Sequence, residues 1–496
     1  MTRRARVTLL NLVLIAMGGA LVHRAVTPAA GVAGAARPNI VFVLTDDLSW
    51  NLVQYMPNVL AMQQEGTTFT RYFVTDSLCC PSRSSIFTGR FPHTTGVYTN
   101  NQRDGGYAAF LSRGNEPLTF AVALQRGGYR TAMMGKYLNG YLPRRHGVPT
   151  GWSEWDVAGA AYKEFDYVLN RNGRIAKYGD TPQDYLTDVV AGLADAFVRK
   201  SARGPFLVEV ATFAPHGPYI PAPRDAEMFP GLTAPRTAAF GVRPDAAAPR
   251  WLRGIPPLTP VDIANIDKHF RMRAQSVLAV DKMIGQLRAT LAALGVDRDT
   301  YVVFSSDNGL HMGEYSMRPG KMTPFDIDVR VPLVIVGPGV ARGRVVEEIA
   351  ENVDLAPTFA ELAGAGTELA GAGAPLAPDG RSLVPLWQGG APSEWRRMAL
   401  IEHRRPFPDS TDPDAPMLHS ENPTSYEALR TAKAMYVEYE TGEVGYYELA
   451  TDPEELRNVA STLSEGARQR WHEALRANRE CRGSEACWSA QRLATE

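Results

Sequence analysis

Four oxygen-donor side chains occur in two pairs that can bind a metal ion. Asp46 and Asp47 form the first pair, Asp307 and Asn308 form the second, and each pair follows a short apolar run. Carboxylate and amide oxygens, without histidine or thiolate, suit a hard cation such as calcium or magnesium better than zinc. Either pair alone is weak evidence, because such residues are common at helix starts and turns. The metal hypothesis therefore depends on the residues that accompany them.

A cysteine motif provides that context. The run Cys79–Arg83 reads C-C-P-S-R, and a Thr-Gly pair follows it after four residues. For an isolated run of this kind, the simpler interpretation is a pair of small buried thiols beside a turn at Pro81. This run is not isolated. Other motifs with polar or charged residues suited to a catalytic site occur along the chain between Arg37 and Pro453.

The motif resembles the C-x-P-S-R-x-x-x-x-T-G signature of the type I sulfatases. In that family the first cysteine, here Cys79, is oxidised to formylglycine by a maturation enzyme, and the hydrated aldehyde is the nucleophile. The resemblance thus implies hydrolysis of sulfate monoesters. A geminal diol suits this reaction, because one hydroxyl attacks sulfur and the other, once deprotonated, expels sulfate and restores the aldehyde. An ordinary serine would remain sulfated.

The same resemblance implies roles for residues around the nucleophile. Arg83 matches the arginine that supports the aldehyde hydrate. Lys136 and Lys321 match the two lysines that contact sulfate, where positive charge stabilises the transition state. His216 matches the histidine near the leaving oxygen, and either His216 or Lys321 would serve as general acid.

A bound cation completes the implied site. The resemblance favours one calcium ion, with magnesium as the less favoured alternative. The ion would hold a sulfate oxygen and the formylglycine oxygen together and neutralise their charge. Its implied ligands are Asp46, Asp47, Asp307, Asn308 and the residue made from Cys79.

One position departs from the common arylsulfatase pattern. Those enzymes carry G-K-W-H, whose histidine helps to deprotonate the diol, whereas the run Gly135–Gly140 reads G-K-Y-L-N-G and has Leu138 in that place. This run, the Cys79-Cys80 pair and the run Val97–Asn101 resemble the branch that contains N-acetylglucosamine-6-sulfatases and extracellular heparan endosulfatases. The identity of the base that releases sulfate is therefore left open by the sequence.

Two further histidines lie near the motifs. His311 follows Asp307 and Asn308 closely and is a candidate for the missing base or for a substrate contact, with a supporting structural role as the alternative. We expect His93 to be structural.

Alternating strands and helices must position these residues. Buried strands are predicted at Ile40–Leu44, Tyr129–Met134, Phe206–Val210 and Tyr301–Phe304, and a helix at Arg273–Leu294, whose apolar residues recur every three or four positions. The polar motifs follow the strands, and in parallel sheets ligands bind at the carboxyl ends of the strands. The patterns predict an α/β fold, and the resemblance implies an alkaline-phosphatase-like, mostly parallel sheet sandwiched by helices.

The chain divides into four predicted parts. They are an export signal (1–35), a catalytic domain (36–365), a Gly/Ala/Pro-rich linker (366–380) and a smaller C-terminal α+β subdomain (381–496). The Pro-, Ala- and Arg-rich stretch from Pro221 to Pro260 is long for a connection. It either forms a wall over the site or is an ordered surface insertion.

The N-terminus resembles an export signal. Three arginines precede the apolar run Val7–Val22, and the small residues Ala33-Gly34-Ala35 offer a cleavage site. We expect a secreted or periplasmic protein without a stable membrane span after cleavage. An uncleaved anchor is the alternative, and the Arg3-Arg4 pair is weak evidence for twin-arginine export.

The charge composition gives no indication of a nucleic-acid partner. Lys and Arg number 52 against 53 Asp and Glu, so no basic field suggests nucleic-acid binding. Cys481 and Cys487, near the C-terminus, are expected to form a short disulfide loop, with two free thiols as the alternative.

Three rival functions remain. A phosphonate or phosphate ester hydrolase would use the same modified cysteine. A sulfated-glycan binding protein would lack the aldehyde, and a membrane-tethered structural protein would lack the metal. The sequence favours a sulfatase acting on a sulfated small molecule or glycan.

Overall fold

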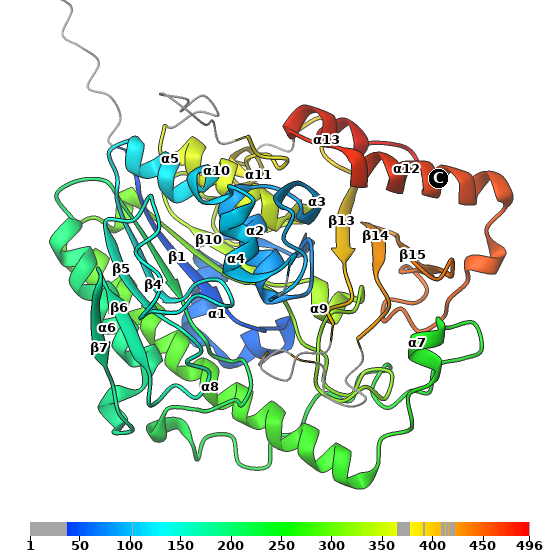
Figure 1. Ribbon diagram of the computed structural model, residues 1–496, viewed down its shortest axis with the longest axis horizontal. Coiled ribbons are helices and arrows are strands. Elements are labelled where there is room, and N and C mark those ends of the chain that lie inside the picture. The colour runs from blue at the N-terminus through cyan, green and yellow to red at the C-terminus, as the bar shows by residue number, and fades with distance from the viewer. Residues whose placement is uncertain are drawn as a thin grey trace, which may run out of the picture. The chain divides into compact units, whose positions relative to one another are not determined.

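The computed structural model describes residues 37–101, 103–364, 377–389, 392–407, 412, 415 and 422–495 (Figure 1). From residue 37 onward the chain forms one compact unit. The predicted export signal lies outside the described residues, as does most of the predicted linker. Within the described part of the chain, no helix is long and apolar enough to cross a membrane.

A ten-stranded sheet is the centre of the molecule, in the order β11-β2-β10-β9-β1-β8-β4-β5-β6-β7. The strands β9, β1, β8, β4 and β5 run parallel, whereas β10, β6 and β7 are antiparallel to their neighbours. The strands are β1 (Asn39–Thr45), β2 (Thr67–Phe69), β4 (Arg130–Lys136), β5 (Glu154–Ala158), β6 (Val168–Arg171), β7 (Arg174–Lys177), β8 (Phe206–Ala211), β9 (Thr300–Ser306), β10 (Leu333–Val336) and β11 (Arg344–Val346). The four strands predicted from apolar runs are confirmed as β1, β4, β8 and β9.

Helices cover both faces of this sheet (Figure 1). Strand β1 contributes Phe42 and Leu44 to one layer and Val41 and Val43 to the other, because successive side chains of a strand point to opposite faces. The first layer contains α2 (Cys79–Thr88), α5 (Phe120–Arg126) and α10 (Leu355–Leu362), and the second contains α1 (Pro57–Glu65), α6 (Leu186–Ser201) and α8 (Pro260–Ala293). The predicted α/β class is confirmed.

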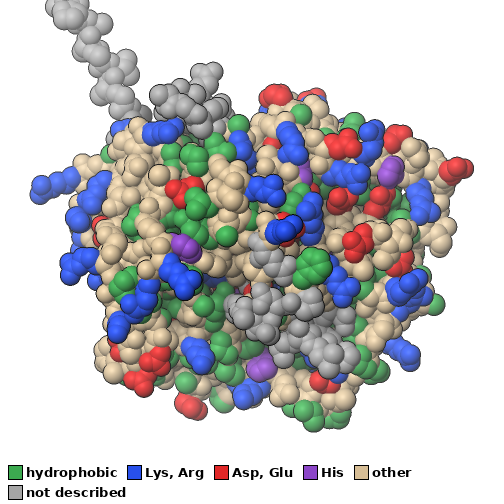
Figure 2. All heavy atoms as spheres, in the orientation of Figure 1, with side chains coloured by type: hydrophobic (Ala, Val, Ile, Leu, Met, Phe, Trp, Pro, Cys, Tyr) green, Lys and Arg blue, Asp and Glu red, His purple; other side chains and the backbone are tan. Residues whose placement is uncertain are grey.

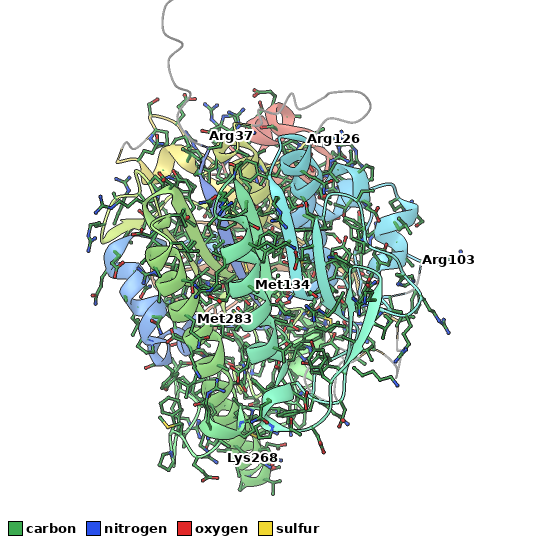
Figure 3. The ribbon with its side chains drawn as sticks, turned by 90° about the vertical axis from the view of Figure 1, so that its left-hand side faces the viewer. Arg37, Arg103, Arg126, Met134, Lys268 and Met283 are labelled. Atoms are coloured by element: carbon green, nitrogen blue, oxygen red, sulfur yellow. A yellow bond between two sulfur atoms is a disulfide. The ribbon has the colours of Figure 1, made fainter. Side chains whose placement is uncertain are left out.

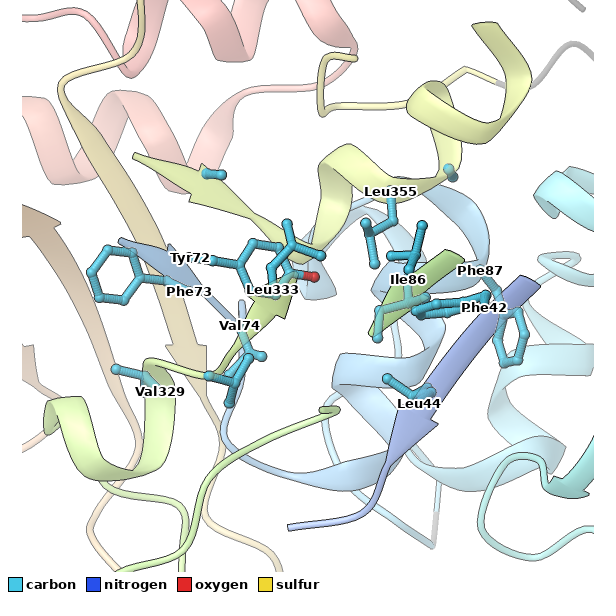
Figure 4. Close-up of a cluster of buried hydrophobic side chains, with 14 of the residues drawn as sticks. Phe42, Leu44, Tyr72, Phe73, Val74, Ile86, Phe87, Val329, Leu333 and Leu355 are labelled. Atoms are coloured by element: carbon cyan, nitrogen blue, oxygen red, sulfur yellow. The ribbon is translucent and has the colours of Figure 1, made fainter. Parts of the chain in front are cut away.

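Each layer has a dense apolar core. In the first, Phe42 and Leu44 of β1 lie near Ile86 and Phe87 of α2 (Figure 4). In the second, Met134 of β4 and Met283 of α8 belong to the same buried cluster (Figure 3). These contacts fix helix α2 over the carboxyl ends of the central strands.

The long helix α8 begins earlier than predicted. It starts at Pro260 rather than Arg273, after a capping box in which Thr259 and Asp262 bond each other's backbone. Proline is favoured in the first turn of a helix, because its missing N–H has no partner there in any case. The prediction was wrong at this end, because the apolar spacing becomes regular only beyond Arg273.

A smaller antiparallel sheet follows in the C-terminal part. Its four strands are β13 (Met398–His403), β14 (Tyr426–Thr431), β15 (Ala434–Tyr439) and β16 (Val444–Glu448). Trp471 and Leu475 of α12 (Glu465–Glu480) pack on it. A disulfide joins Cys481 to Cys487 in α13 (Ser484–Ala490), which confirms the predicted loop.

Shorter elements connect these parts. They are β3 (Tyr72–Phe73), β12 (Ala350–Glu351), α3 (Pro92–Thr95), α4 (Gly106–Ser112), α7 (Arg250–Arg253), α9 (Asp326–Val329) and α11 (Val384–Trp387).

The stretch from Pro221 to Pro260 is ordered and mostly irregular. Its Phe240 pairs with Glu314 by a β-bridge, and Ala239 receives Tyr315 N–H at 2.8 Å. The stretch therefore packs against the loop that follows His311. On the face drawn in Figure 2, basic and acidic side chains are interspersed, as the balanced composition predicts.

Candidate active site

The two oxygen-donor pairs meet where β1 and β9 end. Their parallel register pairs Thr45 with Ser306, so the residues that follow lie side by side. The Asp47 N–H donates to Asp307 Oδ1 at 3.2 Å, and Asn308 Nδ2 donates to Asp47 Oδ1 at 2.7 Å. Asp46, Asp47, Asp307 and Asn308 are all buried. The fold thus brings together donors that are some 260 residues apart in sequence.

Cys79 is the first residue of α2 and points into this cluster. Its Sγ lies 3.2 Å from Asp46 Oδ1 and 3.0 Å from Lys321 Nζ, and the residue is fully buried. In a matured protein the thiol position would be taken by the oxygens of formylglycine. The amino end of a helix favours negative charge, so α2 would stabilise an anionic group at this position.

Arg83 lies one turn along α2 and braces the cluster. Its Nε donates to Asp307 Oδ2 at 2.7 Å, and its Nη1 donates to the Lys136 carbonyl at 2.9 Å. Burial opposes the guanidinium charge, but the carboxylates of Asp307 and Asp46 outweigh it and raise the pKa of Arg83. Arg83 therefore remains cationic.

Two lysines face the first carboxylate pair. Lys136, at the end of β4, bonds Asp46 Oδ2, and Lys321 Nζ lies 2.8 Å from Asp47 Oδ1. Burial opposes the Lys136 charge, but Asp46 and Cys79 raise the pKa of Lys136 well above its ordinary value. Lys136 thus stays charged, and both lysine side chains lie against the first carboxylate pair.

His216 faces the same pair through one ring nitrogen. Its Nδ1 lies 2.7 Å from the Gly217 carbonyl, which can only accept, so Nδ1 carries the proton in the assigned tautomer. Its Nε2 lies 3.6 Å from Asp47 Oδ2. The unprotonated Nε2 of a neutral imidazole can take part in proton transfer or bind a metal.

The donor set fits a hard cation. Ligand atoms of Asp46, Asp47, Cys79 and His216 all lie within 4.8 Å of one another. Among the described residues, Asn308 Oδ1 has no hydrogen-bond partner although it is buried, which leaves one oxygen available for an ion. Three carboxylates and this amide oxygen are the donors that calcium and magnesium prefer.

His311 lies behind the site and is fully buried. Its Nδ1 is 2.9 Å from Asp328 Oδ2, and its backbone pairs with Gly320, the neighbour of Lys321. His311 therefore supports the loop that carries Lys321. His93 bridges Glu402 and the Cys481 carbonyl and has a structural role.

The sequence reasoning missed Arg273 of α8. It is fully buried, and its Nη2 donates to the Asp47 carbonyl, where Asp47 adopts a left-handed φ of 64°. Non-glycine residues rarely adopt this conformation, so an external bond helps to hold it. A signal was present: Arg273 falls on the apolar stripe with Val277 and Val280, where a charge is unexpected.

Tyr162 was also missed. Its ring centroid lies 4.5 Å from that of His216 and 5.0 Å from Lys136 Nζ. The ring thus contacts the imidazole and a site ammonium together, as a cation–π partner. No motif marks it in the sequence, because it lies in a loop far from the other site residues.

A cavity of about 300 Å³ adjoins Lys136. Its lining includes the amides Asn100 and Asn139 and the rings of Tyr162 and Phe213. Leu138, where a histidine stands in many arylsulfatases, is part of the same wall. Apart from Lys136 and Asp412, the wall of this cavity is thus mostly amide, aromatic and aliphatic.

Fold and site together define an α/β protein in which a buried carboxylate cluster that could hold a cation lies beside a cysteine at the first position of a helix. A family model described as Sulfatase matches residues 38–365, and one described as N-sulphoglucosamine sulphohydrolase, C-terminal, matches residues 313–480. The chain belongs to the sulfatase family and is a sulfuric ester hydrolase.

Individual relatives agree with this assignment. Human N-acetylglucosamine-6-sulfatase is 32% identical over 483 residues, which cover 91% of this chain and 85% of the human protein. The extracellular sulfatase SULF-1 homolog of Drosophila melanogaster is 37% identical over 336 residues, which cover 66% of this chain and 30% of the fly protein. The predicted resemblance to this branch is confirmed.

Solved structures share the fold. One, described as a complex with its substrate D-glucosamine-2-N,6-O-disulfate, has a TM-score of 0.73 at 22% identity and covers 93% of this chain and 100% of that chain. The phosphonate monoester hydrolase of Agrobacterium radiobacter has a TM-score of 0.67 at 23% identity and covers 89% and 96%. The alkaline-phosphatase-like fold is confirmed.

Proposed function

We propose that this protein hydrolyses the sulfate ester of a sulfated sugar, with Cys79 converted to formylglycine. The observation that carries the proposal is the setting of Cys79, which begins a helix and contacts both Asp46 and Lys321. A buried structural thiol needs neither a carboxylate nor an ammonium partner. A nucleophile that attacks a sulfate ester needs both a cation site and positive charge.

Each site residue then has a chemical task. A calcium ion held by Asp46, Asp47, Asp307, Asn308 and the formylglycine would neutralise charge on sulfate and nucleophile. Arg83 keeps Asp307 and the nucleophile helix in place. Lys136 and Lys321 bind sulfate oxygens. His216, with its Nε2 towards the cluster, handles the proton of the leaving alcohol, and Lys321 is the second candidate for that task.

For His311 we propose the supporting role that the sequence left open. Its ring is engaged with Asp328, and its backbone holds Gly320 beside Lys321. It would therefore orient a sulfate-binding lysine rather than remove a proton from the diol. Leu138 has no titratable group, so the base that releases sulfate is then a group other than His311.

A 6-O-sulfated glucosamine is the proposed substrate. The human relative is a named N-acetylglucosamine-6-sulfatase, and a structural neighbour was solved with a 6-O-sulfated glucosamine. The cavity beside Lys136 supports this choice, since its volume of about 300 Å³ suits one pyranose ring. Amides such as Asn100 and Asn139 can bond sugar hydroxyls, and Tyr162 offers an apolar ring face.

Location and organisation remain part of the proposal. The extracellular relative supports export of the mature chain, whether secreted or periplasmic, after removal of residues 1–35. A formylglycine-generating enzyme would act on Cys79 during maturation. The division into a catalytic domain (36–365), a linker (366–380) and a C-terminal subdomain (381–496) is kept as a prediction.

Two measurements test the proposal. The first is the mass of the tryptic peptide Tyr72–Arg83 from the exported protein, in which conversion removes one sulfur and two hydrogens and adds one oxygen. The second is the release of sulfate from glucosamine-6-sulfate, compared with phosphate release from a matched phosphate or phosphonate ester. An unmodified Cys79, in a host that matures a control sulfatase, would favour a binding protein. Faster phosphonate hydrolysis would favour the rival activity supported by the phosphonate hydrolase neighbour.

A further inference from the structure

A buried glutamate lies beneath the nucleophile helix. Glu209 stands in the middle of β8, where it pairs with Phe42 of β1 and Met133 of β4. Partners in a parallel register point to the same face, so Glu209 faces the layer that contains α2. The residue is fully buried. A charged residue is unexpected here, because its neighbours on both strands are apolar.

The carboxyl group is unsatisfied among the described residues. Neither Glu209 Oε1 nor Oε2 has a hydrogen-bond partner there, and the same is true of Arg83 Nη2. The two groups interact electrostatically, and Tyr137 is the other titratable group that Glu209 affects. Arg83 is bonded to the Lys136 carbonyl at the end of β4, the strand that pairs with Glu209, so both groups belong to the same layer. A buried carboxyl without a partner is costly, so an unused acceptor and an unused donor in one layer call for an explanation.

We propose that Glu209 is a positioning residue for Arg83, joined to Arg83 Nη2 through one buried water. A water placed there would receive Nη2–H and donate to one carboxyl oxygen, which pairs the Arg83 donor and one of the two Glu209 oxygens. The other donors of Arg83 hold Asp307 and the Lys136 carbonyl. Glu209 would thus complete the support of the guanidinium that orients the cation site and the nucleophile.

Replacing Glu209 with an apolar residue should lower turnover without lowering stability. With one water in place, one Glu209 oxygen still lacks a partner. Replacing a buried, incompletely paired carboxyl with an apolar side chain of similar volume is often neutral or stabilising. Residues kept at such a cost are commonly functional, because activity and stability trade against each other. A merely structural residue would instead lower both stability and activity when replaced.

Three variants test this in the full-length matured protein. Glu209→Met removes the water's partner, Glu209→Gln keeps a hydrogen-bonding group of the same shape, and Met133→Leu is the matched control on the adjacent strand. We expect Glu209→Met to lower kcat about tenfold with KM little changed, in the range seen for residues that orient others, and to leave Tm equal or higher. Glu209→Gln should keep kcat within about twofold, and Met133→Leu should change neither quantity.

Formylglycine content is measured for each variant, so that a maturation defect is separated from a catalytic one. A high-resolution crystal structure of the wild-type protein provides a readout independent of activity. It should contain an ordered water within hydrogen-bond distance of Arg83 Nη2 and a Glu209 oxygen. A dry site, a wild-type kcat for Glu209→Met, or a lowered Tm for that variant would overturn the proposal. Failure of the proposed substrate would leave the water and the Tm result unaffected.

Discussion

Two buried ionic clusters in this molecule differ in how completely they are paired. The active site combines Asp46, Asp47 and Asp307 with three cations. The second cluster joins Arg396 to Glu351 and Asp354, between the large sheet and the C-terminal sheet. In the second cluster all four carboxylate oxygens accept hydrogen bonds, including those from the backbone N–H groups of Leu400, Arg381 and Glu351.

The active site is left incomplete by comparison. Within the described residues, Asn308 Oδ1, Arg83 Nη2 and both Glu209 oxygens make no hydrogen bond. The cluster around Arg396 is therefore suited to holding two parts of the chain together. The active-site cluster has capacity for an ion, a water and a substrate. Arg396 Nε also lacks a partner among the described residues, so unpaired donors occur in both clusters. Buried charge by itself does not separate the two cases, but the unused acceptor oxygens of the active site do.

Removing the nucleophile should have the largest effect. Cys79→Ala deletes the group that becomes formylglycine, so we expect sulfate release to fall by about 10⁴-fold or more. The free energy of unfolding should change little, because the active-site ion pairs remain. Stopped sulfate-release assays and thermal unfolding measure the two quantities. As a control, Cys80→Ala should keep turnover; if both variants were equally active, Cys79 would not be the nucleophile.

Breaking the second cluster should instead act on stability. Arg396→Ala leaves two buried carboxylates without their cation and should cost about 3–5 kcal/mol of unfolding free energy. Turnover per folded molecule should stay near wild type, because Arg396 bonds Glu351 and Asp354 and none of the proposed site residues. Denaturant unfolding and active-site titration check this. The exposed pair of Arg199 and Asp195 provides the control, since solvent screens it and Arg199→Ala should destabilise far less than Arg396→Ala.

Calcium should stabilise the folded protein by binding at the active-site cluster and not at the Arg396 cluster. At a free concentration about 100 times its Kd, calcium should add about 2.7 kcal/mol to the free energy of unfolding, and a chelator should remove that gain. Thermal unfolding with and without calcium measures it. Asn308→Ala should lose most of the gain, whereas Asn478→Ala, a buried asparagine near the C-terminus, should keep it. An equal gain in both variants would contradict the predicted ligand set.

The last expected effect is a pH dependence. Burial raises the pKa of Glu209 to about 8, with Arg83 partly opposing the shift. The folded state thus holds this proton more firmly than the unfolded state, whose glutamate pKa is about 4.3. The contribution of Glu209 to stability is therefore present at low pH and is lost as pH rises towards about 8.

Glu209→Gln lacks this titration. Between about pH 4.5 and pH 8, the wild type should lose unfolding free energy through this titration and the variant should not. The difference, variant minus wild type, should therefore rise with pH, and chemical denaturation at several pH values would measure it. Glu351, whose pKa burial raises to about 7, is present in both proteins and cancels in the comparison. A constant difference across this range would mean that Glu209 does not titrate there.

Much of the scaffold was predictable from local pattern. The runs at Ile40–Leu44 and Phe206–Val210 are apolar on every residue or nearly so, which is typical of strands covered on both faces. The start of α8 was missed because its first turns are partly exposed and carry no regular apolar stripe. Its signal is instead the cap formed by Thr259 and Asp262.

The sequence by itself determined which chemical groups are available: the Cys79 motif, the oxygen-donor pairs and the lysines. It also determined the central strands, because apolar runs reflect burial directly. Only the tertiary structure decided that Arg273 holds the Asp47 backbone, that Tyr162 contacts Lys136 and His216, and that Glu209 is buried between Phe42 and Met133. These contacts join residues far apart in the chain, and no local periodicity records which side chains meet across a folded core.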